Sequence, residues 1–116
     1  MPVTVMALVS INEDAVEDLG IYMRATQPLL KSVGAVIRQR FAINDVVVGK
    51  QDAKSVLVVD YPDRAAVDAV FQSPEYQAVR ENRDRAFPFY QISIIESADV
   101  PEAAGANSVA AGEDTA

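Results

Sequence analysis

The chain has 116 residues, half of them hydrophobic, and a formal net charge of −7. This length suits one domain with one modest core, and the negative charge opposes binding to nucleic acid or to an anionic membrane surface. Cysteine and histidine are both absent, which excludes disulfides, thiolate nucleophiles and the commonest zinc ligands. We therefore expect no metal and no cofactor, and acid–base chemistry would fall to Asp, Glu, Tyr, Lys or Arg.

The start of the chain predicts a strand and no targeting segment. Residues 2–11 (PVTVMALVSI) are β-branched and apolar at both parities, which is typical of a strand buried on both faces. The segment lacks the basic region and cleavage site of a signal peptide, and no apolar run approaches the roughly 18 residues that span a bilayer. With the lack of cysteine, this favours a cytoplasmic protein without a membrane partner.

A long amphipathic helix is predicted over residues 13–33. Apolar positions recur there in steps of three and four, Asn12 is placed to cap the start, and Gly34 suits the exit. Pro28 lies inside this pattern and removes one backbone donor. We therefore expect a kink or a brief restart of the helix near Thr26.

Three more strands are predicted further along the chain. Residues 35–43 alternate in polarity, which predicts a strand with Arg38 and Arg40 on one face. Residues 55–61 (SVLVVDY) form a strand that is apolar at consecutive positions, and residues 87–96 (FPFYQISIIE) form the last one.

The segment between the last two strands is predicted to be helical but interrupted. Proline and aspartate at 62–63 stop the strand and cap a helix over residues 64–71. Ser73 can then act as a new N-cap with Pro74 at the first helical position, where a missing donor costs nothing. A second helical piece follows to about Ala86, so the break restarts the helix at a new angle.

The element order βαββαβ predicts an α+β, ferredoxin-like fold, in which a four-stranded antiparallel sheet carries both helices on one face. The first and third strands are apolar on both parities, through Met6, Leu8 and Val56–Val59. Leaving about 300–500 Å² of the second sheet face wet would cost on the order of 10 kcal/mol at roughly 25 cal/mol per Å². We therefore predict a homodimer that packs sheet to sheet about a two-fold axis.

The last residues differ from the rest in composition. Residues 97–116 are mainly Ala, Gly and acidic residues with little to bury, which predicts a mobile C-terminal tail. We assign residues 1–96 to the folded domain.

Residues 58–83 (VVDYPDRAAVDAVFQSPEYQAVRENR) resemble the signature of the uncharacterised family known as domain of unknown function 1330. In that signature a valine-rich strand and a proline turn precede an Ala-rich helix and a Ser-Pro-Glu-Tyr motif. The likeness extends over about residues 3–96 and includes Tyr22, Arg40 and Asp45. It implies a member of the dimeric α/β-barrel superfamily, in which two ferredoxin-like sheets pack into a shared barrel. Neighbouring families there include cofactor-independent oxygenases and small-molecule isomerases, with ligand pockets between helices and sheet.

Four side chains are candidates for contact with a ligand: Tyr22, Arg40, Asp60 and Tyr76. Either tyrosine could instead be a half-buried packing group whose hydroxyl reaches water. Arg40 lies on a strand and must point to solvent or meet a partner such as Asp60 or a bound anion. Asp60 could orient that arginine, act as a weak base, or only precede the turn at Pro62. No residue can be assigned a catalytic role.

Three functions follow from this interpretation. The first is a homodimeric small-molecule-binding or accessory protein whose ligand is partly apolar and lies between helices and sheet. The second is a cofactor-independent oxygenase or isomerase acting on a small aromatic or keto-acid substrate, in which a tyrosine or carboxylate moves a proton and Arg40 stabilises an enolate or phenolate. The third is a structural dimer without a ligand, which a void-free core would favour.

Overall fold

The computed structural model describes residues 1–97, and residues 98–116 of the predicted tail lie outside the described residues. The elements, in chain order, are β1 (Val3–Ser10), α1 (Val16–Ser32), β2 (Val36–Ala42), β3 (Ser55–Tyr61), α2 (Arg64–Phe71), α3 (Pro74–Ala78), α4 (Arg80–Ala86) and β4 (Phe89–Ile95). This is the predicted βαββαβ order, with the second helical segment divided into three pieces. None of the helices in the described part of the chain is both long enough and apolar enough to span a membrane.

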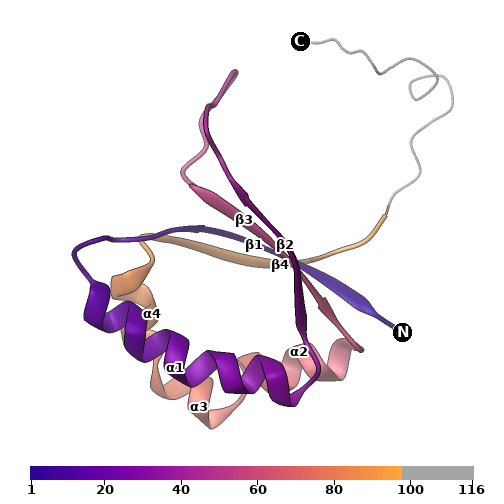
Figure 1. The fold of residues 1–116 in the computed structure, drawn as a ribbon. Helices are drawn as coiled ribbons and strands as arrows, with labels where there is room; N and C mark the ends of the chain where they lie inside the picture. The colour runs from indigo at the N-terminus through magenta and orange to yellow at the C-terminus, as the bar shows by residue number, and fades with distance from the viewer. Residues whose placement is uncertain (98–116) are drawn as a thin grey trace, which may run out of the picture.

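The four strands form one antiparallel sheet in the order β2-β3-β1-β4. All helices lie on one side of this sheet, as Figure 1 shows. Val5 of the inner strand β1 pairs with Val59 of β3 and Ile94 of β4, and its side chain is buried toward the helices. The ferredoxin-like α+β fold predicted from the sequence is therefore confirmed.

Local capping signals explain where the helices of the second half begin. Asp63 accepts a hydrogen bond from the backbone N–H of Ala66, and the Ser73 hydroxyl accepts one from Tyr76. Pro74 occupies the first helical position of α3, as predicted. The second piece is divided at Val79, a break that the sequence did not predict.

The start of α1 differs from the prediction. The helix begins at Val16, and the residue at its N-cap is Ala15. Asn12 instead forms a turn, because its side-chain oxygen accepts from the backbone N–H of Asp14, while its own N–H donates to the carbonyl of Ala86. Asn12 thus ties the β1–α1 connection to the end of α4.

The remainder of α1 is also simpler than expected. The helix runs without interruption from Val16 to Ser32 with Pro28 inside it, so the predicted restart near Thr26 is not seen. Gly34 ends the helix with a φ of 78°, and the N–H of Ala35 donates to the carbonyl of Leu30. This is a Schellman motif, which needs a left-handed residue at the position of the glycine.

A β-bulge in β2 changes which side chains face the helices. Ile37 pairs with Val59 and Gln39 with Val58, so Arg38 is an extra residue between them. After the bulge Arg40 pairs with Leu57 and returns to the helix side, whereas Arg38 reaches Asp60 on the opposite side. The predicted placement of Arg38 and Arg40 on one face was wrong, because a bulge breaks the two-residue alternation.

The buried core consists of two clusters under the helix layer. One is centred on Val5, Val59 and Val70 beneath α2. The other surrounds Tyr22 and Tyr76, where α1, α3 and α4 meet the first residues of β4. Leu29, Leu57 and Phe71 contact both clusters, so side chains from α1, β3 and α2 join the two parts of the core.

The other face of the sheet carries no helix (Figure 1). Register places the side chains of Met6, Leu8, Val56 and Val58 at its centre, where they are only partly buried. Phe41, which pairs with Val56 at the edge, is 46% exposed. In a single chain this apolar surface is exposed to water. The sequence predicted such an apolar second face, and this was the reason to expect a partner that covers it.

Candidate functional site

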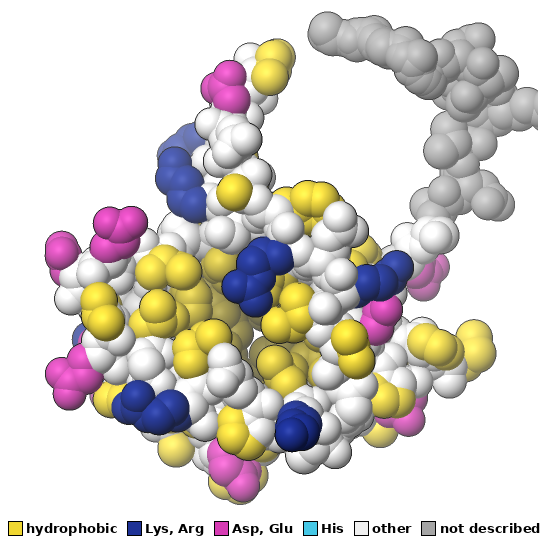
Figure 2. Space-filling model, in the orientation of Figure 1, with side chains coloured by type: hydrophobic (Ala, Val, Ile, Leu, Met, Phe, Trp, Pro, Cys, Tyr) yellow, Lys and Arg dark blue, Asp and Glu magenta, His cyan; other side chains and the backbone are white. Residues whose placement is uncertain are grey.

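A cavity of about 270 Å³ lies between the helix layer and the sheet. Its wall is mainly apolar and is shared by both core clusters, from Val5 and Val59 at one end to Tyr22, Tyr76 and Tyr90 at the other. Figure 2 shows hydrophobic side chains lining a hollow between helices and sheet, with a basic side chain at its rim. The core is therefore not filled by this chain's own side chains.

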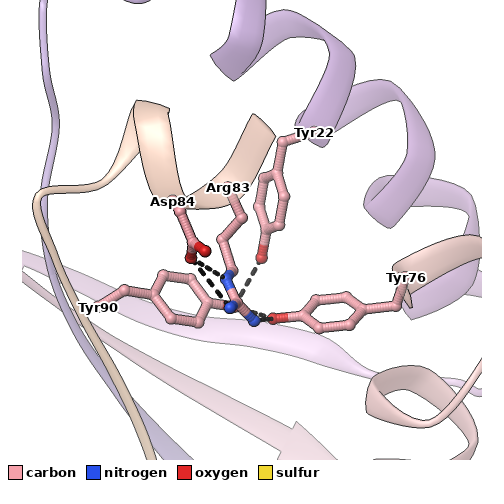
Figure 3. A network of polar contacts seen from close by, with 5 residues as sticks. All are labelled: Tyr22, Tyr76, Arg83, Asp84 and Tyr90. Carbon is pink, nitrogen blue, oxygen red and sulfur yellow. Dashed lines mark hydrogen bonds and ion pairs between the residues drawn. The ribbon is translucent and has the colours of Figure 1, made fainter. Parts of the chain in front are cut away.

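Three tyrosine hydroxyls meet at one end of this cavity. The Tyr90 hydroxyl oxygen lies 2.7 Å from that of Tyr22 and 2.9 Å from that of Tyr76. The rings of Tyr22 and Tyr90 cross edge to face at 86°, with centroids 6.2 Å apart. Figure 3 shows how the side chains converge from α1, α3 and β4. We call these three residues the tyrosine triad.

Arg83 of α4 supports the triad from the outer side. Its Nη1 donates to the Tyr76 hydroxyl at 3.0 Å, and its guanidinium carbon lies 5.6 Å and 5.2 Å from the ring centroids of Tyr76 and Tyr90. Nε and Nη2 both donate to Asp84, at 3.1 Å and 3.0 Å (Figure 3). The guanidinium thus lies beside two aromatic rings and is paired with a carboxylate, and one of its donors is directed at the triad.

Burial sets the protonation state of these groups. It raises the pKa of Tyr22 and of Tyr90 well above the ordinary range, and it raises the pKa of Tyr61, another residue of the cavity wall, to about 12. Burial of Arg83 lowers its pKa, but the hydrogen bonds to Tyr76 and Asp84 outweigh this, so the pKa is raised. At neutral pH the buried tyrosines are therefore neutral hydrogen-bond donors beside a charged arginine.

The structure brings three of the four sequence candidates to the cavity. Tyr22 and Tyr76 are 8% and 3% exposed and belong to the triad, and Arg40 lines the cavity from the edge strand β2. Among residues 1–97, Arg40 makes no hydrogen bond or ion pair. Asp60 lies on the opposite sheet face, where Arg38 Nε reaches its Oδ2 at 2.8 Å and the Thr4 hydroxyl donates to Oδ1 at 3.3 Å. Asp60 is thus separated from Arg40.

Two residues of the site were missed from the sequence. Tyr90 shares the helix-facing parity of its strand with Ile92, and this alternation was the available signal. Arg83 lies in a run of charges that is typical of a solvated helix face, and nothing local distinguishes it from Arg80 or Arg85. Its hydrogen bond to Tyr76 forms only because the fold places α4 beside α3.

The chemistry open to this site is limited by its residues. Within residues 1–97 there is no group of three or more His, Cys, Asp or Glu side chains that could hold a metal ion. The triad can donate a hydrogen bond or pass a proton between hydroxyls, and Arg40 can bind an anion. A second depression of about 580 Å³ over α3 and α4 is lined by Gln77, Ala78 and four charged side chains. It lacks the apolar wall of the cavity between helices and sheet.

Comparison with known families and structures agrees with this architecture. A family model described as domain of unknown function (DUF1330) matches residues 4–98. Among curated proteins, none matches the chain significantly.

Several solved structures share the fold at low sequence identity. A protein of unknown function from Rhodopseudomonas palustris, RPA0582, superposes with a TM-score of 0.70 at 19% identity, covering 85% of this chain and 84% of the other. A dimeric ferredoxin-like protein of unknown function from a Jannaschia species gives 0.61 at 14% identity, covering 84% and 100%. The cofactor-independent oxygenase SnoaB from Streptomyces nogalater gives 0.56 at 11% identity, covering 85% and 95%. At these identities the likeness shows a shared fold.

Proposed function

This chain belongs to the family described as domain of unknown function 1330, and we propose that it is a homodimeric protein that binds a small, largely apolar molecule between its helices and its sheet. The observation that carries the proposal is the cavity of about 270 Å³, with its apolar wall and few polar groups. Known ligand sites are largely apolar, with a few placed polar groups that orient the ligand. An accessory role, in which the molecule is carried or presented, uses the same site.

The size and composition of the cavity favour a small, largely apolar ligand, because each Å² of apolar ligand surface moved out of water contributes roughly 25 cal/mol. Aromatic side chains of Phe71, Phe87 and the triad lie around one end, which suits the edge or face of an aromatic ring. A structural dimer without a ligand is disfavoured, because it predicts a core without such a void.

The homodimer is proposed from the uncovered sheet face. A second copy packed against Met6, Leu8, Val56 and Val58 would remove this apolar surface from water without any other partner. The Jannaschia protein of similar fold is described as dimeric, which supports this assembly. Residues 43–54, the connection between β2 and β3, extend from the sheet away from the helices (Figure 1), toward the space that a second copy would occupy.

A catalytic function is the alternative. The oxygenase from Streptomyces nogalater has a similar fold, and its reaction needs no cofactor. In this chain a cavity tyrosine would have to move the proton, because histidine is absent and no Asp or Glu of residues 1–97 lines the cavity. Arg40 would stabilise an enolate or phenolate. The substrate would be a small aromatic or keto-acid molecule. A cytoplasmic location stays a prediction from the cysteine-free composition.

Ligand binding can be tested with a matched pair of variants on α1. Met23 lines the cavity, so Met23→Trp should fill part of it and raise the dissociation constant of an apolar ligand by about tenfold or more. Val16, on the same helix, is 70% exposed and does not line the cavity, so Val16→Trp should leave binding unchanged. Aromatic and keto-acid compounds would be screened by thermal shift and the hits titrated by calorimetry. If the ligand binds both variants equally, the cavity is not the binding site.

The same hits separate binder from enzyme. Each would be incubated with the protein with and without oxygen, and its absorbance followed over time. A binding protein returns the compound unchanged under both conditions. Turnover in oxygen alone would favour an oxygenase, and turnover under both conditions an isomerase.

A further inference from the structure

The hydrogen bonds of the tyrosine triad leave one proton without an acceptor. Tyr22, Tyr76 and Tyr90 carry three hydroxyl protons, whereas only two contacts join their oxygens. Each contact uses one proton. Among residues 1–97, no other acceptor lies within hydrogen-bond distance of these hydroxyls. One O–H group therefore has no acceptor among these residues, and all three tyrosines belong to the cavity wall.

Arg83 determines which tyrosine holds this proton. A guanidinium only donates, so the Tyr76 oxygen accepts from Nη1 and its own proton is best directed away from the arginine, to Tyr90. The contact between Tyr22 and Tyr90 allows either oxygen to donate, and we assign the donor to Tyr90, so that the hydrogen bonds run in one direction away from Arg83. In such a chain each donor polarises the next. The proton without an acceptor is then that of Tyr22, at the end of this series of hydrogen bonds farthest from the Arg83 guanidinium.

We propose that the Tyr22 hydroxyl donates a hydrogen bond to the carbonyl oxygen of a bound ketone, and that ketones with an aromatic ring are the ligand class of this cavity. This inference rests on the proposed binding function. Tyr22 is 8% exposed and lines the cavity, so water competes poorly for its proton. Its ring contacts Phe87 and Tyr76 edge to face, which fixes the direction of the hydroxyl.

A ketone fits this end of the cavity better than an acid or an alcohol. A carboxylate would have to lose its water beside an arginine whose charge is already paired with Asp84. An alcohol would bring a further proton that also needs an acceptor. A ketone only accepts, and burying it beside an unpaired donor satisfies both groups. Its aromatic ring would contact the edges of the surrounding aromatic side chains.

The proposal is tested with two probes of similar size and shape, benzophenone and its hydrocarbon counterpart diphenylmethane. Each would be titrated by calorimetry into the full-length wild-type protein and into two variants. Tyr22→Phe removes the proposed donor. Tyr61→Phe removes the rival donor, because Tyr61 is another buried tyrosine of the cavity wall and its hydroxyl makes no hydrogen bond within residues 1–97.

We expect wild type to bind benzophenone about tenfold more tightly than diphenylmethane, because only the ketone satisfies the donor. This preference should disappear in Tyr22→Phe and persist in Tyr61→Phe. A second readout is the carbonyl stretching band of bound benzophenone. It should lie at lower frequency in wild type than in Tyr22→Phe, and it reports on the hydrogen bond directly.

The outcomes separate this inference from the proposed function. If both probes bind wild type equally, or if the preference survives in Tyr22→Phe, the cavity binds apolar molecules but the proposed donor is wrong. A preference that is lost only in Tyr61→Phe would likewise overturn it. If neither probe binds wild type, the proposed binding function fails as well. Irradiation of bound benzophenone should label cavity-wall residues such as Met23, and labelling elsewhere would contradict both.

Discussion

The Tyr90 hydroxyl lies 2.7 Å from that of Tyr22, although 68 residues separate them along the chain. One comes from the edge strand β4 and the other from the middle of α1, so this contact joins the sheet to the helix layer beside the cavity. The Tyr76 hydroxyl completes the arrangement at 2.9 Å from Tyr90. Tyr90 is therefore the central member of the triad and the only one that contacts both others through its hydroxyl.

Removing the central hydroxyl should weaken the fold. In Tyr90→Phe the ring remains, but the Tyr22 and Tyr76 hydroxyls lose their shared partner while both stay buried. Leaving buried polar groups unpaired costs about 1–3 kcal/mol, so we expect the free energy of unfolding to fall by that amount. Urea unfolding at a fixed protein concentration measures it, with the slope against urea unchanged.

Tyr61→Phe is the control for this measurement. Tyr61 is 3% exposed, and within residues 1–97 its hydroxyl makes no hydrogen bond. Because this hydroxyl has no hydrogen bond to lose, its removal should not lower the free energy of unfolding. Equal losses in the two variants would mean that the hydrogen bonds of Tyr90 contribute nothing to stability.

The buried tyrosines also predict how stability depends on pH. Burial raises the folded-state pKa of Tyr22 and Tyr90, and that of Tyr61 to about 12. An unfolded tyrosine ionises near pH 10, so above about pH 10 the unfolded chain releases protons that the folded chain retains. Stability should be unaffected by these groups below about pH 10 and should fall above it, by up to about 1.4 kcal/mol per pH unit for each tyrosine.

Urea unfolding at several pH values between neutral and about pH 12 would check this. In Tyr61→Phe the alkaline fall should be less steep, because one group that ionises only on unfolding is gone. The tyrosinate absorbance contributed by Tyr61 to the native protein, measured as wild type minus Tyr61→Phe, should stay low until unfolding begins. A gradual increase of this difference from about pH 10 in the folded protein would show that the Tyr61 hydroxyl is open to solvent.

The parts of the fold that were predicted depend on short-range signals. Ser73 and Pro74 start α3, and Asp63 starts α2, because each cap bonds a backbone group three residues away or less. Asn12 carries the same signal, yet it binds the end of α4, which is distant in sequence. A residue that could cap a helix can therefore form hydrogen bonds with groups distant in sequence, and the helix then starts later.

The candidate site was predicted only in part for a similar reason. Tyr22 and Tyr76 lie near apolar positions of their own helices, so their inward direction follows from helical periodicity. The bulge after Ile37 determines whether Arg38 or Arg40 faces the cavity, and no residue of β2 predicts a bulge at that position. Arg83 and Tyr90 gain their roles from contacts between α3, α4 and β4 that only the folded topology creates.

Placing a charge on the uncovered sheet face should separate the proposed dimer. Val58 lies at the centre of this face and pairs with Met6. In Val58→Lys a buried, unpaired charge would raise the dimer dissociation constant by about a hundredfold or more. Val58→Thr, a milder change, should raise it by about tenfold.

Light scattering over a dilution series would measure both variants. Val16→Lys is the matched control, since it introduces the same charge at an exposed position on the helix side and should leave the assembly unchanged. A dimer that survives Val58→Lys would show that the two copies meet through another surface.

The connection between β2 and β3 should contribute to the same interface. Val47 and Val48 are 89% and 82% exposed in the single chain, and the segment extends from the sheet on the side without helices (Figure 1). If a second copy covers them, Val47→Ser combined with Val48→Ser should raise the dimer dissociation constant by about tenfold. Val16→Ser is the control, because Val16 is an exposed valine on the helix side. An unchanged constant would leave the two valines outside the interface.

Arg40 should select ligands that carry a carboxylate in addition to the ketone. It lines the cavity from the edge strand and has no ion-pair partner among residues 1–97, so an acidic group could reach it while the carbonyl binds at the triad. Wild type should then bind para-benzoylbenzoate more tightly than benzophenone by about threefold to tenfold at low salt. Arg40→Gln should remove this advantage and leave benzophenone binding unchanged.

Arg38→Gln provides the control, because Arg38 lies two residues away on the opposite sheet face and pairs with Asp60. It should not affect either ligand. Because a partly exposed ion pair is screened by salt, the advantage of the carboxylate should shrink as ionic strength rises. If Arg40→Gln and Arg38→Gln behave alike, Arg40 does not bind the acid, and the cavity selects its ligands by shape and by the carbonyl contact.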